Sequence, residues 1–305
     1  MRPLLVAERA CTIGHIFAML FGLAGLVLVL PHPEFIASLP AIGQQAFALS
    51  MVGGGVVYMI LGATAVALYA RRVYGLGPWL AFMLSAVFIS LGSELLGTGT
   101  GFPFGEYHYL SGLGYKISGR VPFTIPLSWF YVGFVTYAIS RAALDRRTQL
   151  PNWARIGGSI ALGSLLLTFW DFVLDPAMSQ TDMQFWMWDQ PGNFFGMPLQ
   201  NFIGWFGTGV LFMSVASLFW SKLPLPITRP QLSVALAIYL ANIIFGAVLS
   251  LAAGMWAPVA LTLLFAIVPV LMLYAAVPVE PGSSDAELLD SEMTAPSVAS
   301  VGVDA

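Results

Sequence analysis

Charged residues are scarce in this chain of 305 residues. Only 9% of the sequence is Asp, Glu, Lys or Arg, whereas a soluble domain carries about a quarter. Hydrophobic residues make up 58% of it. This balance excludes a soluble globular protein and predicts an all-α integral membrane protein whose spans fill nearly the whole chain. The longest polar stretches are loops and a short tail, which leaves no room for a soluble catalytic domain.

Cysteine and histidine are almost absent as well. The single cysteine, Cys11, excludes an internal disulfide and any cluster or zinc site built on cysteine. The three histidines, His15, His32 and His108, are too few for the clustered ligands of a membrane di-iron hydroxylase. His15 is expected to be a packed, hydrogen-bonded residue. We expect no metal, no cofactor and no nucleic-acid partner.

Eight apolar runs have about the 20 residues that a bilayer crossing requires. The first run resembles a signal peptide, but Pro31-His-Pro-Glu34 follows it in place of a small-residue cleavage site. Residues 1–277 are therefore predicted to form a single polytopic membrane domain, with its core motifs in residues 90–206. Residues 278–305, rich in Pro, Ser, Ala and acids, are predicted to be a disordered acidic tail. The expected spans are 10–30, 46–70, 78–96, 121–140, 156–174, 201–220, 231–251 and 255–277.

Lys and Arg residues are distributed asymmetrically between the two ends of these spans. Ten of the 12 basic residues fall on the side of the N-terminus, and only Lys116 and Arg120 fall on the other side. Because cytoplasmic loops carry the excess of basic residues, both termini are predicted to be cytoplasmic. The two long loops, residues 97–120 and 175–200, are then on the outer side. The ten predicted inner residues are Arg2, Arg9, Arg71, Arg72, Arg141, Arg146, Arg147, Arg155, Lys222 and Arg229.

Three acidic residues lie close to the outer ends of spans. Asp171 and Asp175 are four residues apart, which puts both on one face of a helix. Pro176 is predicted to end that helix. Glu94 lies near the end of another span. Acids in hydrocarbon are costly, so they indicate a functional site; the alternative is a structural cap or pair at a helix end.

The outer loops are rich in glycine, proline and aromatic residues. The glycines of residues 97–101 lack the strand, helix and lysine of a phosphate-binding loop. The aromatics suit either an interfacial belt or a structured loop covered by protein. Each loop contains Phe-Gly, then Pro-Leu, then Trp-Phe, and we hypothesise a parallel repeat with a site at its pseudo-axis. In the second span, Gly53–Gly55 are expected to permit close helix contact.

The core motifs resemble the CruF-type carotenoid hydratases. The resemblance covers the third to sixth spans and implies addition of water to the terminal C-1,C-2 double bond of an acyclic carotenoid end, which gives a tertiary alcohol without a cofactor. It implies a substrate such as γ-carotene or lycopene, and some members of the family act on C50 precursors of bacterioruberin. The motifs are Gly-Thr-Gly-Phe-Pro-Phe-Gly-Glu-Tyr-His-Tyr (99–109), Pro-Leu-Ser-Trp-Phe (126–130), Trp-Asp-Phe-Val-Leu-Asp-Pro (170–176) and Phe-Phe-Gly-Met-Pro-Leu-Gln-Asn-Phe-Ile-Gly-Trp-Phe (194–206).

Hydration of such an alkene needs an acid that protonates C-2 and a water that captures the tertiary cation at C-1. Asp171 and Asp175 fit the acid by position, and Glu94 fits the acceptor of the proton from water. Aromatic faces stabilise a cation. The expected partners are a carotenoid within the bilayer and membrane lipid, with other carotenoid biosynthesis enzymes as further candidates. The candidate substrate-binding residues are Trp129, Trp170, Trp186, Trp188, Trp205, Tyr107, His108, Glu106 and Asn201.

Two other classes of function fit the same sequence. Acids inside the membrane, broken helices and a repeat are also features of transporters and of proteins that bind lipophilic molecules. A non-catalytic assembly factor is the third reading, and it predicts that the acids tolerate replacement by amides.

Overall fold

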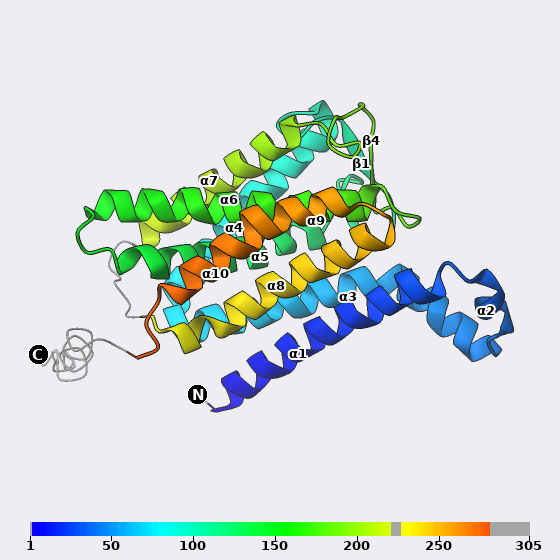
Figure 1. Ribbon diagram of the computed structural model, residues 1–305, viewed down its shortest axis with the longest axis horizontal. Coiled ribbons are helices and arrows are strands. Elements are labelled where there is room, and N and C mark those ends of the chain that lie inside the picture. The colour runs from blue at the N-terminus through cyan, green and yellow to red at the C-terminus, as the bar shows by residue number, and fades with distance from the viewer. Residues whose placement is uncertain (1, 221–226, 281–305) are drawn as a thin grey trace, which may run out of the picture.

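The computed structural model describes residues 2–220 and 227–280. Figure 1 shows a bundle of long helices in which α1 begins and α10 ends at one end, while β1 and β4 lie at the opposite end. The elements are α1 (Arg2–Ala24), the π-helix η1 (Gly25–Val29), α2 (Pro33–Ser38), α3 (Ala41–Tyr74), α4 (Leu76–Thr100), β1 (Tyr107–Tyr109), β2 (Lys116–Ile117), β3 (Val121–Pro122), α5 (Thr124–Asp145), α6 (Asn152–Ser179), β4 (Trp186–Trp188), α7 (Gln200–Phe219), α8 (Arg229–Ala252), α9 (Trp256–Thr262), the π-helix η2 (Leu263–Ile267) and α10 (Val268–Ala275).

The described residues include seven helical stretches that are long and apolar enough to cross a membrane, with α9, η2 and α10 counting as one. The all-α membrane class is thereby confirmed. The expected span 121–140 corresponds to α5, which is not among the seven. Nearly every residue of α5 from Thr124 to Ala143 is buried inside the bundle. Because α5 faces protein on all sides, its composition is freer to include polar residues than that of a helix in contact with lipid.

The sequence predicts that Pro176 ends the helix that carries Asp171 and Asp175. This prediction is wrong, because α6 continues through the proline to Ser179. Proline this close to a helix end removes one backbone hydrogen bond but leaves the final turn otherwise intact. That turn is held from both sides: the Gln180 amide donates to the Pro176 carbonyl at 3.0 Å, and Ser179 Oγ donates to the Asp175 carbonyl at 2.8 Å. Burial of the whole segment then keeps it helical.

The end of the bundle at which α1 begins carries most of the basic residues. Arg2 and Arg9 lie on α1, Arg71 and Arg72 lie in the last turn of α3, and Arg229 opens α8. Lys222 and the greater part of the predicted tail, from residue 281, lie outside the described residues. The basic asymmetry therefore has a spatial counterpart, and the cytoplasmic assignment of this end stays a prediction, as does the single-domain organisation.

The two units of the predicted repeat pack against each other in the structure. α4 and α6 each pack against both α5 and α7, and β1 pairs antiparallel with β4. The Pro-Leu and Trp-Phe pairs of the predicted repeat lie at the first turns of α5 and α7, as Pro126-Leu127 with Trp129-Phe130 and as Pro198-Leu199 with Trp205-Phe206. The two tryptophans stack on each other, with centroids 4.3 Å apart. These are relations expected of two units about a two-fold axis, and superposition of α4–α5 on α6–α7 remains the test.

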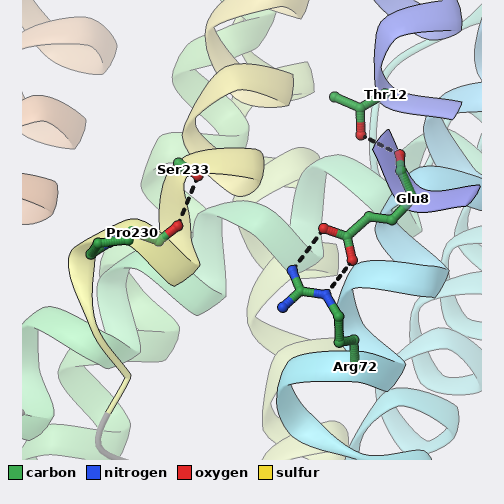
Figure 2. Close-up of polar contacts among 5 residues, drawn as sticks. All are labelled: Glu8, Thr12, Arg72, Pro230 and Ser233. Carbon is green, nitrogen blue, oxygen red and sulfur yellow. Dashed lines mark hydrogen bonds and ion pairs between the residues drawn. The ribbon is translucent and has the colours of Figure 1, made fainter. Parts of the chain in front are cut away.

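Two buried polar contacts tie α1 to its neighbours. His15 is fully buried, as expected, with Nδ1 2.7 Å from the Tyr58 carbonyl. Glu8 is also fully buried, and its two carboxylate oxygens accept hydrogen bonds from Nε and Nη2 of Arg72 at 2.6 and 2.7 Å. Figure 2 shows this bidentate pair joining α1 to the end of α3. Its planar, two-bond geometry is the strong form of an Arg–carboxylate contact.

Replacing Glu8 by alanine is expected to leave the Arg72 guanidinium largely buried and unpaired. Breaking a buried pair in this way costs about 3–5 kcal/mol, and the part of Arg72 that reaches solvent moves the expected loss toward the lower value. Thermal unfolding in detergent measures it. The control is the double variant Glu8→Leu, Arg72→Met, which removes both charges and should recover most of the lost stability. If the double variant is as unstable as Glu8→Ala, the pair is not what joins the helices.

Candidate active site

One small cavity lies between α3, α4, α5, α6 and α7 beneath the paired strands, with a volume of about 50 Å³. Glu94, Asp171 and Asp175 all line it. The structure thus brings the three acids of the sequence analysis to one place, although they come from two helices. A space of this size holds one or two water molecules. Its walls also include Tyr107, Trp129, Trp170, Trp186, Trp188, Asn201 and Trp205.

Glu94 is buried on α4 and accepts hydrogen bonds on both carboxylate oxygens. Oε1 accepts from Trp129 Nε1 at 2.9 Å, and Oε2 accepts from the hydroxyls of Tyr109, at 2.9 Å, and Tyr107. Burial raises the pKa of both tyrosine hydroxyls well above the ordinary value, and the Glu94 carboxylate raises it further. The tyrosines therefore stay protonated and remain donors to Glu94.

Asp175 is buried one turn beyond Asp171 and is held in a similar way by indole donors. Trp186 Nε1 donates to Oδ2 at 2.9 Å, and Trp188 Nε1 donates to Oδ1 at 3.0 Å. The Ser179 hydroxyl lies 3.0 Å from Oδ1 and shares its single proton between this oxygen and the Asp175 carbonyl. Tryptophan N–H is a donor only, so this carboxylate is fixed in the role of acceptor.

The strand pair explains how four donors reach the two carboxylates. In β1 and β4 the side chains alternate between two faces, so every second residue points into the bundle. Tyr107 and Tyr109 from β1 face inward, and Trp186 and Trp188 come from the opposing strand in register with them. The intervening residue of β1, His108, is exposed.

Two of the candidate substrate-binding residues therefore do not join the others. His108 lies on the outward face of β1, where Nδ1 is 2.9 Å from Asp189 Oδ1. Glu106 is also exposed, and its backbone amide donates to Gln190 Oε1 at 3.1 Å. The reason is the strand alternation, which the sequence analysis did not foresee because it treated the segment as an irregular loop.

Asp171 differs from the other two acids. Asn201 Nδ2 donates to its Oδ2 at 2.8 Å, but Oδ1 is buried without a hydrogen-bond partner among the described residues. The indole N–H of the neighbouring Trp170 is buried and unpaired in the same way. An unsatisfied buried acceptor and donor on two cavity-lining residues are costly unless something else bonds to them. Among the described residues, Asp171 is the one of the three acids with a carboxyl oxygen that has no hydrogen-bond partner, and this oxygen is available to hold a proton or to meet a ligand.

Aromatic rings enclose the space beside these acids. Trp129 and Trp205 are stacked with an interplanar angle of 30°, and Trp170 meets Trp205 edge to face at 5.9 Å. Tyr107 and Trp188 lie 5.2 Å apart across the strand pair. Ring faces attract cations, most strongly where water is excluded. The cavity is therefore suited to a positive charge that has no hydrogen bonds of its own.

A second, polar pocket of about 360 Å³ opens beside the cavity. Ser179 and Trp188, which both bond to Asp175, line it together with Gln184 and Asp189. Trp188 borders both spaces. Water on this side of the protein is thus separated from the acids by one layer of side chains.

Three residues of the site were missed by the sequence analysis. Tyr109 follows Tyr107 by two positions, which would have been a signal had β1 been recognised as a strand. Ser179 follows Asp175 by four positions, the spacing of one helical turn, and was missed because the helix was expected to end at Pro176. Tyr58 lines the cavity from α3 and carries no signal in the sequence.

Comparison with known proteins places these motifs in a family. Residues 54–269 match the family model described as carotenoid biosynthesis protein. Over 204 residues the chain is 31% identical to bisanhydrobacterioruberin hydratase of Haloarcula japonica, and the alignment covers 67% of this chain and 63% of that relative. No solved structure matches. The family model covers the acids, both paired strands and the large helices around them, and this chain therefore belongs to the carotenoid biosynthesis protein family.

Proposed function

We propose that the protein adds water to the terminal C-1,C-2 double bond of an acyclic carotenoid end group, forming a tertiary alcohol. The observation that carries the proposal is the unpartnered Oδ1 of buried Asp171 in a ring-lined cavity with two other carboxylates whose oxygens are already bonded. The hydratase name of the relative supports the same reaction class. Addition of water is redox-neutral, so the chemistry can be written with the side chains and water alone.

Asp171 is the proton donor in this mechanism. Its free oxygen carries the proton to C-2, and the electrons of the double bond form the new C–H bond. The positive charge is left on the tertiary carbon C-1. Trp129, Trp170 and Trp205 face this charge, and the fixed carboxylates of Glu94 and Asp175 stabilise it through space. Desolvation makes each of these contacts stronger than it would be in water.

Water then captures the cation at C-1. The unpaired N–H of Trp170 is suited to holding that water by its oxygen. The proton released from the water reaches Glu94 through a tyrosine hydroxyl, that of Tyr107 or Tyr109. The tyrosine gives its own proton to Glu94 and takes the proton from the water. Tyrosine can do this because its hydroxyl both donates and accepts, whereas the indoles around Asp175 only donate. Return of the proton to Asp171 restores the starting state.

The substrate class follows from the site and from the relative. An acyclic end is more slender than a cyclised one, which suits a cavity enclosed by aromatic rings, and γ-carotene and lycopene carry such an end. The relative's name adds bisanhydrobacterioruberin as a third candidate substrate. We also propose that the basic end of the bundle, with both termini, faces the cytoplasm. The site then opens toward the outer surface, with water supplied through the polar pocket beside Trp188.

Replacing Asp171 by asparagine is expected to reduce hydration by at least about 100-fold, because an amide cannot donate the proton and general acids contribute about 10²–10⁴-fold. The assay follows the hydrated pigment in cells that make lycopene or γ-carotene. Asp182→Asn is the matched control, since Asp182 is exposed and lies outside the cavity. Equal membrane abundance of the three proteins excludes a folding defect, and full activity of Asp171→Asn would rule out this residue as the acid.

Replacing Trp205 by leucine is expected to slow turnover by about 30-fold, because a desolvated ring–cation contact is worth about 2 kcal/mol. Trp205→Phe keeps a ring face and should retain most of the rate. Trp256→Leu, at a tryptophan that is 72% exposed, is the control for loss of an indole elsewhere. If Phe and Leu at position 205 give the same rate, ring stabilisation of a cation is the wrong account.

Heavy-oxygen water tests the reaction class directly. We expect one ¹⁸O atom in each new hydroxyl group when purified membranes convert the carotenoid in H₂¹⁸O, because water is the nucleophile. Mass spectrometry of the product measures the label. A hydroxyl without label would exclude hydration, and a protein that accumulates solute without changing the pigment would favour the transporter reading.

A further inference from the structure

A much larger cavity, of about 600 Å³, lies next to the candidate active site. It is bounded by the end of α1 with η1, by α2, and by the first half of α3, the helices that project from the bundle in Figure 1. Phe185 and Phe245 close it on the side of the bundle. Its lining carries no charged residue, and the Ser50 hydroxyl in its wall is already bonded to the Phe47 carbonyl. The lining of this cavity therefore offers mainly apolar contact.

Only a thin wall separates this cavity from the one that holds the acids. Tyr58 lines both. Phe185 lines the large cavity, while the next residue, Trp186, lines the small one and donates to Asp175. On the other side of the wall, Gly55 lines the large cavity, and a Cβ at Gly55 would lie 3.2 Å from Leu113 of the small one. Single residues therefore separate the two cavities.

Three glycines leave room for the large cavity. A Cβ atom added at Gly25, Gly53 or Gly54 would meet no atom within 4 Å, and all three residues line the cavity. The prediction that Gly53–Gly55 permit close helix contact is therefore wrong. Gly55 does lie close to another segment, because an added Cβ would lie 2.7 Å from the Gly112 carbonyl oxygen, but Gly112 belongs to the loop after β1 and not to a helix. At the other two positions, the missing side chain leaves open space where a helix contact was expected.

We propose that this cavity binds the conjugated chain of the carotenoid and directs its end group past Tyr58 to Asp171. The inference rests on the proposed hydration. A conjugated hydrocarbon has no hydrogen-bonding group, so an uncharged apolar wall satisfies it completely, and burial of its surface supplies the binding energy. The small cavity is far too small for a long stiff molecule, so the conjugated chain needs an adjoining apolar site. The large cavity is the adjoining site, in the position the chemistry requires.

The test replaces Gly54 by leucine, which adds a side chain to the wall of the cavity at a position where a Cβ atom would meet no neighbouring atom. Carotenoid bound to the purified full-length protein is measured by its visible absorption per mole of protein. One additional methylene in a hydrophobic pocket changes affinity by about 10–200-fold. The Gly54→Leu protein should therefore retain no more than about a tenth of the pigment that the wild-type protein binds, and its KM should be higher. Gly207→Leu is the matched control: Gly207 is an exposed helical glycine with no atom near its Cβ position, and it lines neither cavity.

Asp171→Asn separates this inference from the hydration itself, because it should bind pigment at the wild-type level while making no product. Loss of pigment in Gly54→Leu, with retention in Gly207→Leu and Asp171→Asn, supports the cavity as the carotenoid site. Retention of pigment and KM by Gly54→Leu overturns that assignment and leaves a lipid acyl chain as the occupant, whatever the activity of Asp171→Asn. Full activity of Asp171→Asn together with loss of pigment in Gly54→Leu would overturn only the assignment of Asp171 as the proton donor.

Discussion

Buried carboxyl groups need hydrogen-bond donors, and this requirement shapes the end of the protein that carries β1 and β4. An ionised acid in hydrocarbon without partners is too costly to keep. Glu94 and Asp175 are each held by three side chains, mostly from a pair of short strands that cover the bundle. With three residues on each side the sheet is very small, and its inward-facing side chains are four of the donors to these two acids. The helices supply the acids, and the segments between the helices supply most of the hydrogen-bond donors to them.

Asp171 stands out against this background because the same surroundings do not complete its hydrogen bonds. One oxygen bonds to Asn201, and the other has no partner in the part of the chain that the structure describes. Natural proteins rarely leave such a group in their interior, and exceptions concentrate where a ligand or a reaction uses them. Of the three acids in one cavity, Asp171 alone has a carboxyl oxygen with no partner among the described residues, and this contrast is more informative than the burial of any one of them.

Much of the architecture was readable in the sequence, because apolar runs long enough to cross a bilayer have few alternatives. The acids were found for the same reason, since a charge in an apolar run is conspicuous. The outward position of His108, the continuation of α6 through Pro176 and the cavity beside Gly54 were not readable. Each depends on contacts between segments far apart in the chain: the pairing of β1 with β4, the burial of the last turn of α6, and the splaying of α1 and α3 from the bundle.

The origin of the donors has a consequence for biogenesis. Every side chain that bonds to Glu94 comes from residues 107–129, and every side chain that bonds to Asp171 or Asp175 comes from residues 179–201. Each helical hairpin thus brings its own partners for its own acids. During synthesis the donors to Glu94 therefore leave the ribosome together with the hairpin that carries this acid, and the later arrival of β4 completes the strand pair that aligns Tyr107 and Tyr109. Each half depends on the other for the alignment of its donors, but not for the donors themselves.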